Sequence, residues 1–154
     1  MVAGDLKDYA PVADSVRVAG ERTLGVELDV TNSESARAAV EAAIAQFGGL
    51  HILVNNAGID QRGRLEELSE ADSDRVLAVN LKGPFLCTRA AAQHLEGGGA
   101  MSHLWRAEAR VRCTAATTRH RRLGLTRHLA LELGLLPKHS ASRDTGRIYL
   151  TAAP

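Results

Sequence analysis

Leu50-His51-Ile52-Leu53-Val54-Asn55-Asn56-Ala57-Gly58 is the stretch of this sequence that decides the fold. Its first part, Leu50 to Val54, is a mainly apolar run with the length of a strand that is covered on both faces. Its second part is a polar turn that ends in glycine. In parallel sheets, ligands bind beyond the carboxyl ends of the strands. The stretch therefore predicts an α/β fold with a binding site near the turn.

Strand and helix patterns alternate through the first two thirds of the chain. The expected elements, in order, are a strand over 1–6, a helix over 8–19, a strand over 23–30, a helix over 33–47, a strand over 50–54 and a helix over 70–95. Pro11 fits only the first turn of its helix, and Ser33 is the expected N-cap of the next one. The side chains expected on or near the buried side of the long helix are Val76, Leu77, Val79, Asn80, Phe85, Leu86 and Leu95. Short connections between such elements predict parallel strands.

Composition sets further limits. The 154 residues suit a single domain, and with 45% apolar but only 3% aromatic residues the core must consist of Ala, Val, Leu and Ile. A net charge of +1 favours no particular partner, and no apolar run predicts a membrane span, so we expect a cytoplasmic protein. Cys87 and Cys113 fit no metal spacing and are expected to be reduced. We therefore predict no metal site.

The Asn55–Gly58 turn and the later Val79-Asn80 pair together resemble the short-chain dehydrogenase/reductase family. The resemblance covers residues 1–96 and 123–134. It implies a Rossmann-like, doubly wound parallel sheet. It also implies an NAD(P)-dependent oxidoreductase that interconverts a small-molecule alcohol and a ketone, and an intact parent that is a homo-oligomer.

The same resemblance assigns roles to residues at the ends of three strands. A carboxylate at Asp5 would accept both hydroxyls of the adenosine ribose and repel a 2′-phosphate, so NAD is favoured over NADP. Asp29 and Val30 would lie beside the adenine. Taken singly, each residue is more simply interpreted as a helix cap or turn former, but their joint spacing favours the cofactor. The expected cofactor-binding residues are Asp5, Asp29, Val30, Asn56, Ala57 and Gly58, with Gly58 needed for a close approach to the nicotinamide side.

Asn80 is the expected catalytic residue. A polar amide in a helix between Val79 and Leu81 is usually exposed or bonded locally. The resemblance implies another role, in which this Asn interrupts the hydrogen bonding of the helix and holds a water of a proton relay.

Other parts of the family pattern are missing. The strand of residues 1–6 matches the second strand of the family, so the first strand, its glycine-rich turn and the first helix have no counterpart here. The expected fold is therefore an incomplete Rossmann-like sheet within one partial domain over residues 1–154. Because the first strand would lie at the centre of the sheet, we expect exposed edges on its two neighbours.

The Tyr and Lys that transfer the proton in the family are also missing. Counting back from the family-like helix over 123–133 places Ala115 at the position of the family's Tyr and Arg119 at that of its Lys. Ser102 has the spacing of the family's Ser, but its neighbours do not match, so the spacing is interpreted as coincidence. Weak or no turnover is therefore predicted for this chain.

Residues 100–122 are rich in Arg and contain one acid, Glu108. A nucleic-acid surface is disfavoured because only Trp105 could stack on bases. Out-of-frame translation of an ordinary dehydrogenase gene, over 100–122 and about 135–147, explains this composition better, and residues 135–154 match the family poorly. A coding DNA sequence whose codons, read in the shifted frame, cannot encode the family-like residues would refute this hypothesis.

Two alternatives to an enzyme stay open. The chain could be a non-catalytic remnant, or a partner subunit that associates with an intact dehydrogenase through its long helices. Leu125, Leu129 and Leu133 fit such a helix face, although a Leu stripe is more often ordinary core. The small core predicts poor solubility or a molten state.

Overall fold

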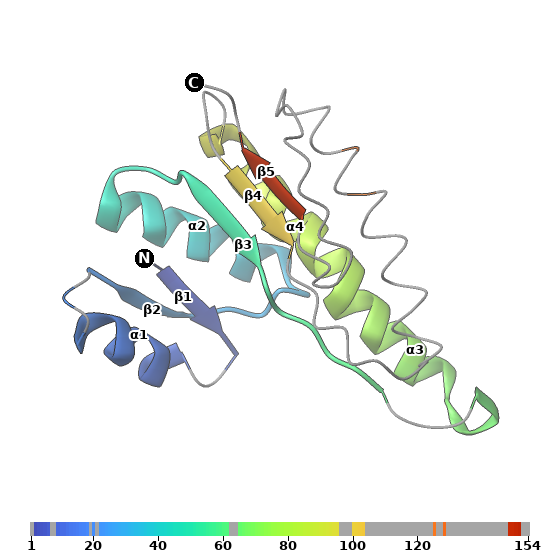
Figure 1. The fold of residues 1–154 in the computed structure, drawn as a ribbon. Coiled ribbons are helices and arrows are strands. Elements are labelled where there is room, and N and C mark those ends of the chain that lie inside the picture. The colour runs from blue at the N-terminus through green and yellow to red at the C-terminus, as the bar shows by residue number, and fades with distance from the viewer. Residues whose placement is uncertain are drawn as a thin grey trace.

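A computed structural model describes residues 2–6, 9–18, 20, 22–61, 65–95, 100–103, 125, 128 and 148–151. Strands and helices alternate in this part of the chain, as the sequence predicts (Figure 1). The elements are β1 (Val2–Asp5), α1 (Tyr9–Val18), β2 (Leu24–Glu27), α2 (Ser33–Phe47), β3 (Ile52–Asn55), the 3-10 turn η1 (Leu65–Glu67), α3 (Glu70–Leu77), the π-helical turn η2 (Ala78–Lys82), α4 (Gly83–Leu95), β4 (Ala100–His103) and β5 (Ile148–Thr151).

The described strands form two separate sheets. β1 pairs with β2 in parallel, from Val2 opposite Leu24 to Asp5 opposite Glu27. β3 pairs in parallel with β4, and β4 pairs in antiparallel with β5. Among the described strands, β1 and β3 are thus end strands of their sheets.

β3 corrects the prediction of a strand covered on both faces. Ile52 is 63% exposed and Val54 49% exposed, whereas Leu53 between them is half-buried and Asn55 is buried. The side chain of Leu53 packs against a cluster between α2 and α4. Because successive side chains of a strand point to opposite faces, the helices cover only the face of Leu53 and Asn55.

The core lies where α2 packs on α4. Val40, Ala91 and Leu95 are buried there, and they are surrounded by partly buried Ile44, Leu50, Leu53 and Ala90. Ala36 and Ala43 are also buried on α2. Small side chains let the two helices approach closely, which agrees with a core of Ala, Val, Leu and Ile.

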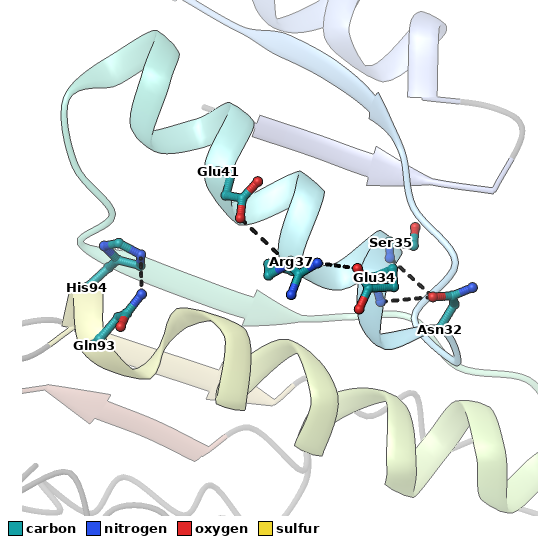
Figure 2. A network of polar contacts seen from close by, with 7 residues as sticks. All are labelled: Asn32, Glu34, Ser35, Arg37, Glu41, Gln93 and His94. Carbon is teal, nitrogen blue, oxygen red and sulfur yellow. Dashed lines mark hydrogen bonds and ion pairs between the residues drawn. The ribbon is translucent and has the colours of Figure 1, made fainter.

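The N-terminus of α2 corrects the predicted cap by one residue. Asn32, not Ser33, is the N-cap, because its Oδ1 accepts hydrogen bonds from the backbone N–H groups of Glu34 (2.9 Å) and Ser35 (3.2 Å) (Figure 2). Arg37 forms ion pairs with Glu34 and Glu41 on the exposed side of the helix, where such pairs contribute little. Asn32 therefore fixes where α2 begins.

The helix predicted over residues 70–95 is helical throughout but not uniform. It begins with a capping box in which Ser69 and Asp72 exchange hydrogen bonds, and those bonds lower the pKa of Asp72. The π turn of η2 then interrupts the α-helical pattern at Ala78–Lys82. Of the expected buried residues, Phe85 is wrong: it is 38% exposed, and the Arg89 guanidinium lies 5.6 Å from its ring centroid.

The structure describes all of residues 100–103 but only two residues of the helix predicted over 123–133. Residues 100–103 form β4, although the local sequence has no strand period; pairing with β3 and β5 overrides the weak pattern. Of the family-like helix over 123–133, the structure describes only Leu125, which is half-buried, and His128, which is exposed. Leu129 and Leu133 lie outside the described residues.

No helix among the described residues is both long and apolar enough to cross a membrane.

The N-cap gives the first prediction. Asn32→Ala should lower the free energy of unfolding by about 1 kcal/mol, because two backbone N–H groups of α2 lose their acceptor. Urea unfolding followed by circular dichroism measures this. Ser33→Ala is the matched control and should change stability by less than about 0.5 kcal/mol. A larger loss for Ser33→Ala than for Asn32→Ala would restore Ser33 as the cap.

The thiol of Cys87 gives the second prediction. Burial in α4 raises the pKa of Cys87 from 9.0 to about 11. Because the folded pKa is the higher one, this group's stabilising contribution is complete below pH 9.0 and is lost as the pH rises to about 11. The free energy of unfolding should therefore fall over this interval by about 2 kcal/mol more in the natural chain than in Cys87→Ala. Equal losses in urea unfolding of both proteins would contradict a buried, protonated thiol.

Candidate functional site

The candidate site lies at the carboxyl ends of β1, β2 and β3. Asp5 is the last residue of β1 and is exposed, and its backbone oxygen accepts a hydrogen bond from Leu28 N–H at 2.9 Å. This bond extends the parallel ladder by one step beyond Glu27, so Asp5 lies beside the loop that leaves β2. The first two predicted cofactor segments, Asp5 and the loop of Asp29, are thus adjacent.

Asp29 shapes that loop. Its Oδ1 accepts hydrogen bonds from the backbone N–H of Thr31 (2.9 Å) and from the Thr31 hydroxyl (2.7 Å), and its own N–H donates to Ser35 Oγ (3.0 Å). These bonds turn the chain toward α2, which explains why β2 ends at Glu27 and not near Val30 as predicted. Asp29 therefore acts as a turn former in this structure.

Val30 packs against the start of α4. A Cβ placed on Gly83 would lie only 2.9 Å from Val30 Cγ2 and 3.2 Å from Val30 Cβ. Glycine at this position lets the helix approach the loop after β2. Gly83 was not among the predicted site residues, although a Gly-Pro pair inside a predicted helix is an unusual pattern that could have indicated it.

Asn80 connects the π turn to the loop after β3. It is 1% exposed; its Oδ1 accepts a hydrogen bond from Ile59 N–H and its Nδ2 donates one to Ile59 O, both at 2.8 Å. The side chain thus pairs with both backbone groups of one residue, as a neighbouring strand would. Ile59 was not among the predicted residues, and its position directly after Gly58 was the only signal for it.

The turn of Asn56, Ala57 and Gly58 lies between the end of β3 and Ile59, and it is exposed. Asn56 N–H donates to Val54 O at 3.2 Å, which makes the turn tight. A Cβ on Gly58 would lie 3.4 Å from Asn80 Oδ1, which is van der Waals contact, so the backbone of Gly58 lies directly against the Asn80 pair. The predicted nicotinamide-side residues and the predicted catalytic Asn80 are therefore brought together.

A second buried polar link supports this arrangement. Asn55 Nδ2 donates to Thr88 Oγ1 at 3.4 Å, and the Thr88 hydroxyl donates to Met101 Sδ at 3.1 Å. All three side chains are buried. They join β3, α4 and β4 directly below the exposed turn, and a pairing of residues so distant in sequence could not be predicted locally.

Of the three positions that were counted back from the family-like helix, the structure describes only Ser102. Ser102 lies in β4 with its backbone opposite Val54 of β3. Ala115 and Arg119 lie outside the described residues. Within the part of the chain that the structure describes, no group of three or more His, Cys, Asp or Glu side chains could hold a metal ion.

Comparison with known proteins places this geometry in a family. The sequence model of short chain dehydrogenases matches residues 1–102. The 3-alpha-(or 20-beta)-hydroxysteroid dehydrogenase of Mycobacterium bovis is 39% identical over 140 residues, which cover 87% of this chain and 54% of that protein. The chain belongs to the short-chain dehydrogenase family, whose members are oxidoreductases.

Solved structures of the family have the same fold. A short-chain dehydrogenase/reductase of Burkholderia phymatum in complex with NAD superposes with a TM-score of 0.78 at 28% identity, over 85% of this chain and 50% of that one. A Burkholderia cenocepacia short chain dehydrogenase in complex with NADP gives 0.76 at 30% identity, over 84% and 57%. The predicted Rossmann-like α/β fold is thus confirmed. The chain spans about half the length of the relatives it matches.

The Asn80 pair gives the third prediction. Asn80→Ala should destabilise the protein by about 1 to 3 kcal/mol, because it leaves Ile59 N–H and O without partners in a partly buried place. Amide hydrogen exchange at Ile59 should speed up in this variant. Asn80→Asp keeps the acceptor for Ile59 N–H and is the matched control, with protection at Ile59 closer to that of the natural chain. Unchanged exchange at Ile59 in Asn80→Ala would contradict the anchoring role.

Proposed function

We propose that this chain carries a nicotinamide dinucleotide site at the carboxyl ends of β1, β2 and β3. The observation that carries the proposal is the Asn80–Ile59 pair, which holds the exposed Asn56–Gly58 turn at the sheet edge where ligands of such folds bind. The family relationship and the NAD and NADP complexes of similar structures support it. In this proposal the cofactor supplies a hydride acceptor or donor for an alcohol or carbonyl substrate.

The described residues fit such a ligand. The Asp5 carboxylate is exposed at the end of β1, where it can accept hydrogen bonds from two ribose hydroxyls. Asp29 and Val30 lie in the adjacent loop, and Val30 offers an apolar contact for an adenine ring. Gly58 is exposed in the turn, so its backbone can be approached by a flat ring.

The roles that follow are binding and positioning. Asp5 selects the ribose, Asn56 to Gly58 present backbone groups to the nicotinamide side, and Asn80 holds that turn in place. Since both ends of the Asn80 amide already pair with Ile59, the catalytic role proposed for Asn80 depends on the π turn around it. That turn breaks the regular hydrogen-bonding pattern of the helix and offers a place for a relay water.

We further propose that hydride transfer by the chain as written is weak or absent. Ala115 and Arg119 stand where the family pattern places a Tyr and a Lys, and Ala has no proton to give to or take from a substrate oxygen. Sustained oxidation of NADH by this chain with a ketone substrate would contradict this part of the proposal.

A nucleotide titration tests the site and gives the fourth prediction. The natural chain should bind NADH more tightly than NADPH, measured by the fluorescence of the reduced nicotinamide. Asp5→Ser should weaken NADH binding by about ten- to a hundredfold, because charge-assisted hydrogen bonds contribute about 1.5 to 3 kcal/mol. Asp5→Ser should also reduce the difference between the affinities for NADH and NADPH.

Asp74→Asn is the matched control. Asp74 is an exposed acid on α3, away from the three strand ends, so its replacement should leave both affinities unchanged. Equal binding of NADH and NADPH by the natural chain would remove Asp5 from the site. If neither nucleotide binds, the whole proposed function is contradicted.

A further inference from the structure

Residues 59–61, which continue the exposed turn after β3, are held against the long helix at two points. At the first residue of this segment, Asn80 pairs with both backbone groups of Ile59. At the last residue, the Arg75 guanidinium donates a hydrogen bond through Nη2 to Gln61 Oε1 at 2.9 Å. Figure 1 shows the chain that leaves β3 running beside α3 toward the N-terminus of that helix. The segment therefore lies antiparallel to the helix.

The spacing of the two contacts fits this arrangement. The two helix residues that make the contacts are five positions apart, which corresponds to about 7.5 Å of helix rise. The two segment residues are two positions apart, which corresponds to about 6.6 Å of extended chain. Because these lengths nearly match, both contacts can form at once without bending the segment.

The π turn of η2 brings the two helix side chains toward one side. In a regular α-helix each residue turns by about 100°, so side chains five positions apart point about 140° away from each other. Such side chains are poorly placed to hold one segment. Asn80 lies inside η2, where the hydrogen bonds reach one residue further and each residue turns by less. The π turn therefore narrows the angle between Arg75 and Asn80, and the long Arg75 side chain spans the rest.

Arg75 is itself oriented by the start of α3. Its Nη2 also lies 3.9 Å from Asp72 Oδ1, one helical turn away, and Asp72 exchanges hydrogen bonds with Ser69 in the capping box. The Arg75 side chain is 62% exposed, whereas Asn80 is buried. Since exposed charged contacts contribute less than buried hydrogen bonds, the Gln61 end of the segment is the more weakly held end.

We infer that Arg75 is a positioning residue of the dinucleotide site, which acts through Gln61 to set the direction in which the chain leaves the turn after β3. This inference rests on the proposed function. The single anchor at Ile59 fixes one point of the backbone, and the second anchor two residues later also fixes the direction of the chain. The backbone proposed to face the nicotinamide is then held in one orientation before the ligand binds, which lowers the entropic cost of binding.

Nucleotide titration of the whole 154-residue chain tests this inference and gives the fifth prediction. Arg75→Ala should weaken NADH binding by about three- to tenfold, the range expected for the loss of one hydrogen bond. Binding of ADP-ribose, measured by calorimetry, should stay unchanged, because this ligand lacks the nicotinamide and would contact only the ends of β1 and β2. A residue that only stabilises the fold would not change one affinity and spare the other.

Variants of Gln61 test whether Arg75 acts through this residue. Gln61→Ala should weaken NADH binding as much as Arg75→Ala does, and the double variant should bind no more weakly than either single variant. Gln61→Glu keeps an acceptor for the guanidinium and should bind NADH as the natural chain does. Circular dichroism checks that the helices are retained, and Arg75→Met, which keeps most of the aliphatic stem, replaces Arg75→Ala if they are not.

Arg37→Ala is the matched control. Arg37 forms exposed ion pairs on α2 and is 61% exposed, close to Arg75, but it lies away from the segment. Its replacement should leave both affinities unchanged. Three results would overturn the inference: NADH binding that Arg75→Ala leaves unchanged, an equal loss of ADP-ribose binding, or additive effects of Arg75→Ala and Gln61→Ala. If the natural chain binds neither NADH nor ADP-ribose, the proposed function fails and the inference fails with it.

Discussion

The site depends on one buried amide. Asn80 pairs through both ends of its side chain with the backbone of Ile59, and this contact joins the long helix to the turn that follows β3. A buried amide without partners would cost several kcal/mol, so the helix and the turn are tied to a single relative position. Gly58 lies against the same side chain, and the exposed backbone of Asn56 and Ala57 is held between these fixed points. The π turn around Asn80 is the local adjustment of the helix at the point where this contact is made.

The rest of the fold supports that contact through helix packing. α2 and α4 pack together through Val40, Ala91 and Leu95, and this layer connects the two sheets. The chain of Asn55, Thr88 and Met101 adds a polar link below the turn. With so few large side chains, the free energy that holds the sheets in place comes from many small contacts and from these specific hydrogen bonds. The removal of one of these hydrogen bonds should therefore disturb the geometry of the candidate site.

The residues proposed to bind the cofactor and the positions expected to transfer a proton lie in different parts of this sequence. The residues proposed to contact a dinucleotide lie in the described strands and loops before residue 60, and Asn80 lies in the long helix that follows them. The positions at which the family pattern places its proton donor and its Lys hold Ala115 and Arg119. Membership of the short-chain dehydrogenase family thus accounts for the fold, while the ability to move a proton depends on particular residues.

The sequence by itself determined the order and kind of the elements from β1 to α4, because helical and apolar periods are local properties of the chain. It also indicated that Asn80 and the Asn55–Gly58 turn belong together. Boundaries that depend on one hydrogen bond were missed: Asn32 caps α2 where Ser33 was expected, and the Asp29 turn ends β2 early. Only the tertiary structure decided that Ile59 is the partner of Asn80, that Gly83 makes room for Val30, and that one face of β3 stays open. These depend on contacts between residues far apart in the chain, for which a single sequence carries no local signal.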